Sequence, residues 1–233
     1  MTKIIIYVLL LSVFIPTLFA NQAVSTINAQ IGGIYGRIDG ITSKTVIGNI
    51  AIPVGPVCGI QFDGLKGKIH TGNAQGMGLH AFWRDYQTGL MGLAISKAEL
   101  DNVKATKIGV EVEIYRAEST LGFYGGCQYG DIDSSGYGSL MAGYYPHKNL
   151  MLGIEANISD SISRYSFGFE YQYTNQNISL YGNITGGENK YDHIFLGLKI
   201  NFGPTKKTLI RHHREDDSIN PLISHIINIY SRH

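Results

Sequence analysis

The stretch YSFGFEYQY, from Tyr165 to Tyr173, decides the fold because large aromatic residues alternate along it with small or polar ones. A period of two places successive side chains on opposite faces of a β-strand. The odd-numbered positions are all Tyr or Phe, whereas the even-numbered positions are Ser, Gly, Glu and Gln. The segment therefore predicts a strand with one aromatic face and one face that mixes glycine with polar groups.

Three further segments, 106–114, 150–158 and 194–202, repeat this alternation. In each, aliphatic or aromatic residues dominate one face, and charged side chains share the other face with glycine, as Glu111 does with Gly109. A soluble sandwich would bury small and apolar residues together and expose the charges. A barrel in lipid turns its apolar residues outward and keeps glycine and paired charges inside. We therefore predict a transmembrane barrel, with a soluble lipocalin-like barrel or a sandwich as the alternative.

Candidate strands of this kind recur along most of the chain. Counting them gives about twelve, an even number of the kind found in bacterial barrels. Their centres lie near Ile31, Ile50, Ile60, Leu79, Leu93, Val110, Phe123, Leu140, Leu152, Phe169, Leu180 and Leu198. The predicted fold class is all-β, an up-and-down antiparallel transmembrane barrel with a short C-terminal tail.

The segments between these strands predict two unlike ends of the barrel. Tight turns are expected at 53–56, 86–89, 116–119, 146–148 and 174–177. Longer connections, richer in Gly, Asp and Ser, are expected at 66–73, 131–136 and 185–190. Short periplasmic turns and longer external loops are typical of outer-membrane barrels.

Four aromatic residues fall where strands reach the tight-turn side. They are Trp83, Tyr144, Tyr173 and Phe202. Aromatic side chains favour membrane interfaces, where the ring lies in lipid and a polar group meets water. We predict that these four mark an interface; the alternative is the ordinary preference of aromatic residues for strands.

The N-terminus has the pattern of a secretory signal peptide. Lys3 precedes an apolar run from Ile4 to Phe19, and Ala20 is followed by polar residues. A basic start, an apolar segment of about 15 residues and a small residue at the cleavage site are typical of exported chains. The run is short for a membrane-spanning helix of about 20 residues, which is the alternative. The predicted division is a signal peptide (1–20), an outer-membrane barrel (21–204) and a periplasmic tail (205–233).

Three segments are informative beyond their alternation: AIPVGPVCGIQFDG (51–64), GLHAFWRDYQTGLMGL (78–93) and the closing strand IFLGLKINFG (194–203). On these segments the chain resembles small porin-like outer-membrane β-barrel proteins of proteobacteria, over roughly Val46 to Phe202. The resemblance implies a bacterial outer-membrane location, contact with membrane lipid and recognition by the barrel-assembly machinery during biogenesis. Such chains often end at the aromatic residue of the last strand, whereas Phe202 is internal here.

Strand parity predicts which side chains face the interior. The expected lumen-lining residues are Gln61, Asp63, His80, Arg84, Lys107, Glu111, Glu113, Glu155, Glu170, Gln172 and Lys199. These groups can fill the lumen as a salt-bridged core or leave a narrow aqueous path between them. Because acids outnumber bases in this set, an open pore should prefer cations slightly.

The tail after Pro204 is basic at first and then acidic at 215–217. From Pro221 the spacing of the apolar residues 222, 223, 226, 227 and 230 predicts a short amphipathic helix. Such a helix could lie on the inner leaflet, plug the periplasmic mouth or bind a partner; a frayed tail is the alternative. The histidines at 212, 213, 225 and 233 match no standard metal-site spacing.

The two cysteines, Cys58 and Cys127, lie on strands far apart in the predicted order. An exported protein could form a disulfide. Both cysteines share parity with lipid-facing neighbours, so we predict two unpaired thiols, buried on the lipid side.

These features favour a narrow passive channel for small polar solutes. A lipid-modifying outer-membrane enzyme would need a serine and a histidine near the lipid-facing surface. His80 points inward by parity, His70, His147 and His193 lie in or beside loops, and no Gly-x-Ser-x-Gly motif occurs. A closed structural barrel is the other alternative.

Nucleotide, cofactor and nucleic-acid binding find no support in the sequence. The glycines are scattered along strands instead of grouped before a helix, the net charge is +1, and no basic patch interleaves with aromatic residues. We therefore expect no cofactor and no nucleic-acid partner.

Overall fold

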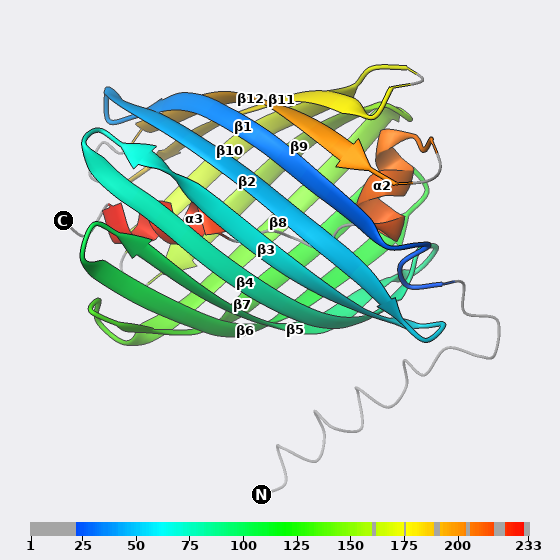
Figure 1. Ribbon diagram of the computed structural model, residues 1–233, viewed down its shortest axis with the longest axis horizontal. Coiled ribbons are helices and arrows are strands. Elements are labelled where there is room, and N and C mark those ends of the chain that lie inside the picture. The colour runs from blue at the N-terminus through cyan, green and yellow to red at the C-terminus, as the bar shows by residue number, and fades with distance from the viewer. Residues whose placement is uncertain are drawn as a thin grey trace, which may run out of the picture.

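The computed structural model describes residues 22–159, 162–174, 176–188, 192–203, 206–216 and 222–230. Within these residues, twelve antiparallel strands form one closed barrel, in which sequence neighbours pair and β12 pairs with β1 (Figure 1). The strands are β1 (Asn28–Ile38), β2 (Ile41–Val54), β3 (Cys58–Ile69), β4 (Gly72–Asp85), β5 (Gly89–Leu100), β6 (Val103–Arg116), β7 (Ser119–Gly130), β8 (Ser135–His147), β9 (Leu150–Ser159), β10 (Ile162–Gln172), β11 (Ile178–Gly187) and β12 (Asp192–Phe202). The predicted fold class is confirmed, and each predicted strand centre lies in its own strand. The predicted signal peptide lies outside the described residues.

Two helices follow the last strand, α2 (Leu209–Glu215) and α3 (Leu222–Tyr230). Figure 1 shows α2 at the end of the barrel where β1 begins and β12 ends, which we call the α2 end. The helix α3 lies inside the barrel toward the opposite end, the α3 end, where it packs on β3, β4, β5 and β6. Neither these helices nor any other in the described residues is long and apolar enough to cross a membrane.

The two faces of the wall differ as the alternation predicts. Large apolar side chains stand on the outer face with much of their surface exposed, as for Leu93 (64%) and Ile154 (60%). Their inward neighbours in sequence are buried or half-buried, among them Ala94 and Glu155. A continuous apolar outer surface of this kind is stable only when something other than water covers it, and acyl chains do so in outer-membrane barrels.

The predicted difference in loop length between the two ends is wrong. Lys66–Ile69 belong to β3 and Gly72 opens β4, so only two residues connect strands where a long loop is expected. The connections 131–134 and 188–191 have four residues each, whereas 173–177 at the α2 end has five. Polar and glycine-rich sequence extends the strands here, because inward-facing positions of a barrel accept such residues. Loop length therefore does not distinguish the two ends.

The turn between β1 and β2 shows why the α3 end can close so tightly. Asp39 and Gly40 both have positive φ, 49° and 77°. This is the backbone of a two-residue turn whose twist matches the flanking strands, and Asp-Gly favours it.

At the α2 end, β8 has a register shift between Tyr144 and His147, where Pro146 cannot donate a ladder hydrogen bond.

Candidate functional site

The barrel interior contains all the residues that parity predicts to line the lumen. Gln61, His80, Arg84 and Glu111 are fully buried, the next most buried are Asp63, Lys107, Glu113, Glu170 and Gln172, and Glu155 and Lys199 are half-buried. They do not form one continuous lining. Most of them either belong to a packed cluster on the wall of β3–β6 or line an open chamber along the opposite wall.

The packed cluster is built around His80 on β4. Its Nε2 lies 2.7 Å from Asp63 Oδ2 on β3, and its Nδ1 lies 2.8 Å from Glu111 Oε2 on β6. Gln61 Nε2 donates to the other oxygen of Asp63 at 2.8 Å. Each polar group thus has partners inside the wall, as burial of charge requires.

Glycines on the neighbouring strands make room for these carboxylates. A Cβ at Gly92 of β5 would lie 2.7 Å from Glu111 Oε1, and one at Gly78 would lie 3.1 Å from Asp63 Oδ2. The side chain of Glu111 can therefore reach across β5 to His80. This requirement explains why glycine shares the inner face with charged residues.

The second ion cluster lies near the α2 end. Lys199 Nζ on β12 is 2.8 Å from Glu170 Oε1 on β10, and His213 Nε2 on α2 is 3.2 Å from Glu170 Oε2. Tyr145 holds the other ring nitrogen of His213 at 2.9 Å. The tail therefore contributes directly to the polar interior, which strand parity alone does not predict.

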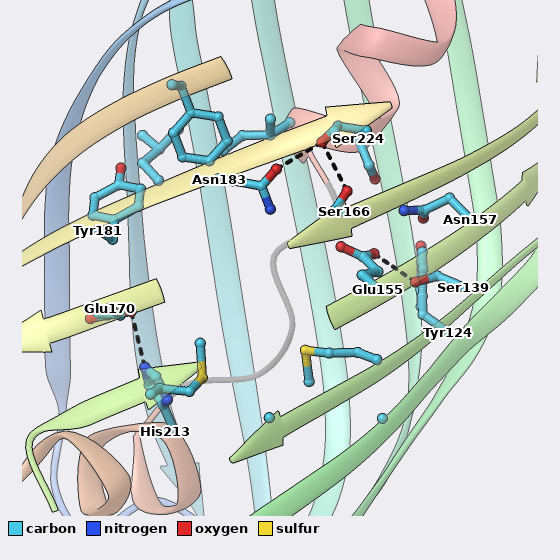
Figure 2. A pocket seen from close by; sticks show the side chains of 18 of the residues that line it. Tyr124, Ser139, Glu155, Asn157, Ser166, Glu170, Tyr181, Asn183, His213 and Ser224 are labelled. Atoms are coloured by element: carbon cyan, nitrogen blue, oxygen red, sulfur yellow. Dashed lines mark hydrogen bonds and ion pairs between the residues drawn. The ribbon is translucent and has the colours of Figure 1, made fainter. Parts of the chain in front are cut away.

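A cavity of about 370 Å³ runs along the wall formed by β7–β12, β1 and β2, and it also reaches Glu113 of β6. His213 of α2 lies at one end of it, and Ile223, Ser224 and Ile227 of α3 line it elsewhere. We call it the chamber. Figure 2 shows Glu155 and Ser139 on its wall beside Asn157 and Tyr124.

The chamber wall carries both polar and apolar groups. Its polar side chains include a hydrogen-bonded row in which Ser166 Oγ lies 2.8 Å from Thr185 Oγ1 and Thr185 donates to Asn183 Oδ1 at 2.7 Å. Its apolar groups are Ile47, Met141, Met151, Phe195, Ile223 and Ile227. Such a mixture is typical of sites for small molecules, in which a few polar groups orient a ligand against an apolar wall.

Polar contacts fix α2 across its end of the barrel. Ile210 N donates to Lys148 O at 3.1 Å, and Arg214 donates to Ser119 O at 2.9 Å, so α2 bonds to the turn between β8 and β9 and to the first residue of β7. Buried Lys207, just before α2, pairs with Asp216 at 2.6 Å and Glu215 at 3.2 Å.

The predicted tail helix is present as α3, and it lies in the lumen toward the α3 end rather than at the mouth where β12 ends. Leu222, Ile226, Ile227 and Ile229 are buried in one apolar cluster with inward residues of β3–β6, namely Leu65, Ile69, Ala74, Ala98, Leu100 and Ala105. Leu222 reaches the wall so closely that a Cβ at Gly76 would lie 3.2 Å from its Cδ2. The apolar face of the helix and the apolar inner wall at the α3 end therefore bury each other.

His225 is the polar residue within this apolar contact. Its Nδ1 lies 3.1 Å from Ser96 Oγ on β5, and its Nε2 has no hydrogen-bond partner among the described residues. Burial, and then the charge of Lys107, lower the pKa of His225 to about 2. The docked helix therefore holds this histidine in its neutral form.

The predicted interface aromatics lie on the outer face near the α2 end. Tyr144 and Phe202 are each 52% exposed and Tyr173 is 43% exposed, while Trp83 is half-buried. Their contact with a membrane interface stays a prediction. Cys58 and Cys127 are free and exposed on the outer face, which confirms that they are unpaired; their burial in lipid stays a prediction.

Several chamber residues are absent from the sequence-based set of lumen residues. Ser139, Asn157, Asn183 and Arg164 all face the chamber. Parity could have found them, because Arg164 continues the inward positions 166, 168 and 170 of β10 by one step. One feature of the sequence could have indicated that α3 lies in the lumen: the inward positions at the α3 end of β3–β6 are unusually apolar.

The closed wall, apolar outer face and polar interior define the class of twelve-stranded membrane barrels with porin architecture. Comparison with solved structures agrees. The KdgM porin, solved in complex with disordered oligogalacturonate, superposes with a TM-score of 0.62 at 8% identity, over 75% of this chain and 99% of the porin. The NanC porin has a TM-score of 0.58 at 8% identity, over 73% and 98%.

An enzyme has a comparable barrel. Outer membrane phospholipase A from Escherichia coli superposes with a TM-score of 0.53 at 10% identity, covering 75% of this chain and 90% of the enzyme. No family model and no curated protein sequence matches this chain. At these identities the likeness concerns the fold, and it distinguishes neither a channel from an enzyme nor one solute from another.

Proposed function

We propose that the chain is an outer-membrane channel for small polar solutes, whose passage is narrowed by its own C-terminal segment. One observation carries the proposal: a helix of the tail occupies the lumen against β3–β6, whereas the other side of the lumen keeps a cavity of about 370 Å³ lined by polar and apolar side chains of the strands. A barrel that serves only as structure has no need of a chamber lined by polar groups. The apolar outer face and the fold of the similar porins support the location in an outer membrane.

In this proposal, small polar solutes pass through the chamber. The wall of β3–β6 is filled by the His80 cluster and by α3, so it leaves no room for solute. The chamber is lined by Glu113, Glu155 and Glu170 together with Arg164 and Lys199, besides its histidines. With three acids against two permanent bases, a slight preference for cations follows, and a reversal potential that favours anions would refute it.

The test is single-channel conductance of the refolded mature chain in a planar bilayer, beside a chain that lacks residues 205–233. Heat-modifiable gel mobility of both proteins serves as the control for a folded barrel. We expect stable conductance steps that are larger in the shortened chain. Silence from both folded barrels would refute the channel and favour a structural or enzymatic role.

A full-length variant separates the effect of α3 from that of a missing tail. Leu222→Asp places a charge in the apolar contact with β3–β6 and should release α3, because an unpaired charge is costly there. Lys206→Ala changes an exposed residue of the same tail and is the matched control. Larger steps in Leu222→Asp alone are the expected result.

The enzymatic alternative has a testable structural requirement. The histidine bonded to a serine in the described residues is His225, and this pair with Ser96 lies inside the lumen. Among the described residues, no serine on the outer face bonds a histidine. Lipase activity of the refolded protein that is lost on replacing a single histidine would favour the enzyme over the channel.

A further inference from the structure

Glu155 differs from Glu170, another carboxylate that lines the chamber. Glu170 is neutralised by Lys199 at 2.8 Å and His213 at 3.2 Å. Glu155 accepts one hydrogen bond, from Ser139 Oγ at 2.6 Å, and has no ion pair with any described residue. Among the described residues, the charge of Glu155 is therefore not balanced by direct contact with a cation.

The immediate neighbours of Glu155 on the wall are uncharged. Across the strands, Met141 of β8 and Ser166 of β10 stand directly opposite it. Figure 2 places Asn157 and Tyr124 near it on the same side of the chamber. Side chains of serine and asparagine therefore line the same part of the wall as the carboxylate, and their oxygen atoms can accept hydrogen bonds from a donor bound there.

A half-buried carboxylate attracts a cation more strongly than one in free water, because the protein wall lowers the effective dielectric constant. The rest of the chamber adds apolar surface from Met151, Phe195, Ile223 and Ile227. An inorganic ion would gain nothing from that surface. A short organic chain that carries an ammonium group would gain both the ionic contact and burial of its carbon atoms.

We propose that the chamber is a binding site for small organic cations, whose ammonium group contacts Glu155 while their apolar part lies against the methionine and aromatic side chains. This inference rests on the proposed function, since it names the class of solute that the channel takes up. Ser139 positions the carboxylate, and Asn157 offers a second acceptor for the ammonium protons.

The experiment measures equilibrium binding by isothermal titration calorimetry, with the refolded full-length protein in detergent. The probes are n-butylammonium chloride, the uncharged n-butanol of equal chain length, and potassium chloride. The variant Glu155→Gln keeps the size of the side chain and an acceptor for Ser139 but removes the charge. Glu99→Gln, on an outward residue of β5 that bonds Gln75, is the matched control.

We expect butylammonium to bind more tightly than butanol and potassium to the parent protein and to Glu99→Gln, and Glu155→Gln to weaken it about tenfold or more, as loss of a charged contact predicts. Equal binding of butylammonium and butanol, or unchanged binding in Glu155→Gln, would overturn the proposal. Equal binding of potassium would replace the organic cation by an inorganic one.

This result is independent of conductance. Binding that depends on Glu155 in a protein without conductance would uphold the site and refute the channel. Conductance that increases on removal of the tail, without any preference for butylammonium, would uphold the channel and refute the site.

Discussion

Acid should release α3 from the barrel wall through His225. The helix packs on β3–β6, whose inner faces carry the ionisable side chains Asp63, His80, Arg84, Lys107, Glu111, Glu113 and Tyr115. Of these, Lys107 is the charge that acts on His225, and it opposes protonation as burial does. No carboxylate in the described residues bonds this imidazole to offset those two effects.

The sign and size follow from the two pKa values. The pKa of His225 is about 2 in the docked helix, against an ordinary value of 6.5 that it regains on release. Above pH 6.5 the histidine is neutral in both states and costs nothing. Below 6.5 only the released helix binds the proton, so docking weakens as the pH falls. At pH 4.5, two units lower, the loss is about 2.7 kcal/mol, or about 100-fold in the docked-to-released ratio.

The assay is ¹⁹F NMR of a trifluoromethyl label on Ser224→Cys, in a chain with Cys58→Ser and Cys127→Ser. Adding Leu222→Ala weakens the apolar contact and brings the released population into a measurable range. The logarithm of the docked-to-released ratio should fall by about one per pH unit between pH 6 and 4. In His225→Gln, which cannot protonate, this histidine-dependent slope should vanish. An equal slope in His225→Gln and its parent would refute the reasoning.

Three further perturbations test the wall itself. His80→Ala leaves two buried carboxylates without their shared partner, so the free energy of unfolding in urea should fall by about 3–5 kcal/mol; an unchanged midpoint would contradict the paired cluster. Gly92→Val must collide with Glu111 and lower the temperature of heat-modifiable mobility, whereas Gly64→Val, with open space at its Cβ, should not. Leu93→Arg on the outer face should lower the free energy of unfolding in lipid vesicles by about 2–4 kcal/mol if the residue faces the bilayer midplane. Equal stability of the variant and the parent protein in vesicles would argue against that depth.

The alternation of side chains was sufficient to predict the strands and their faces. A strand has a fixed period of two, so a one-residue error would exchange the two faces completely. For this reason Gln61, Glu113 and Lys199 could be placed inside before any pairing was known. Loop lengths were less predictable, because inward positions accept glycine and polar residues that otherwise indicate turns, as at Lys66–Asn73.

Which inward residues meet each other depended on the register of strand pairing. The contacts of His80 with Asp63 and Glu111 join three strands. They form because the register brings these residues close together and because Gly92 leaves space for the side chain of Glu111. Likewise, only the pairing register reveals that Glu155 faces Met141 and Ser166 while Glu170 receives Lys199. Parity fixes the face of a residue but carries no information on its neighbours across the sheet.

The sequence by itself determined a closed β-barrel with an apolar outside, a polar inside and an amphipathic helix near the C-terminus. It left open where that helix lies, because an apolar helix face can cover any apolar surface of suitable shape. The tertiary structure decided the matter by gathering Leu65, Ile69, Ala98 and Leu100 from separate strands into one inward apolar patch at the α3 end. Hydrophobic burial is non-directional, so only the assembled surface selects its partner.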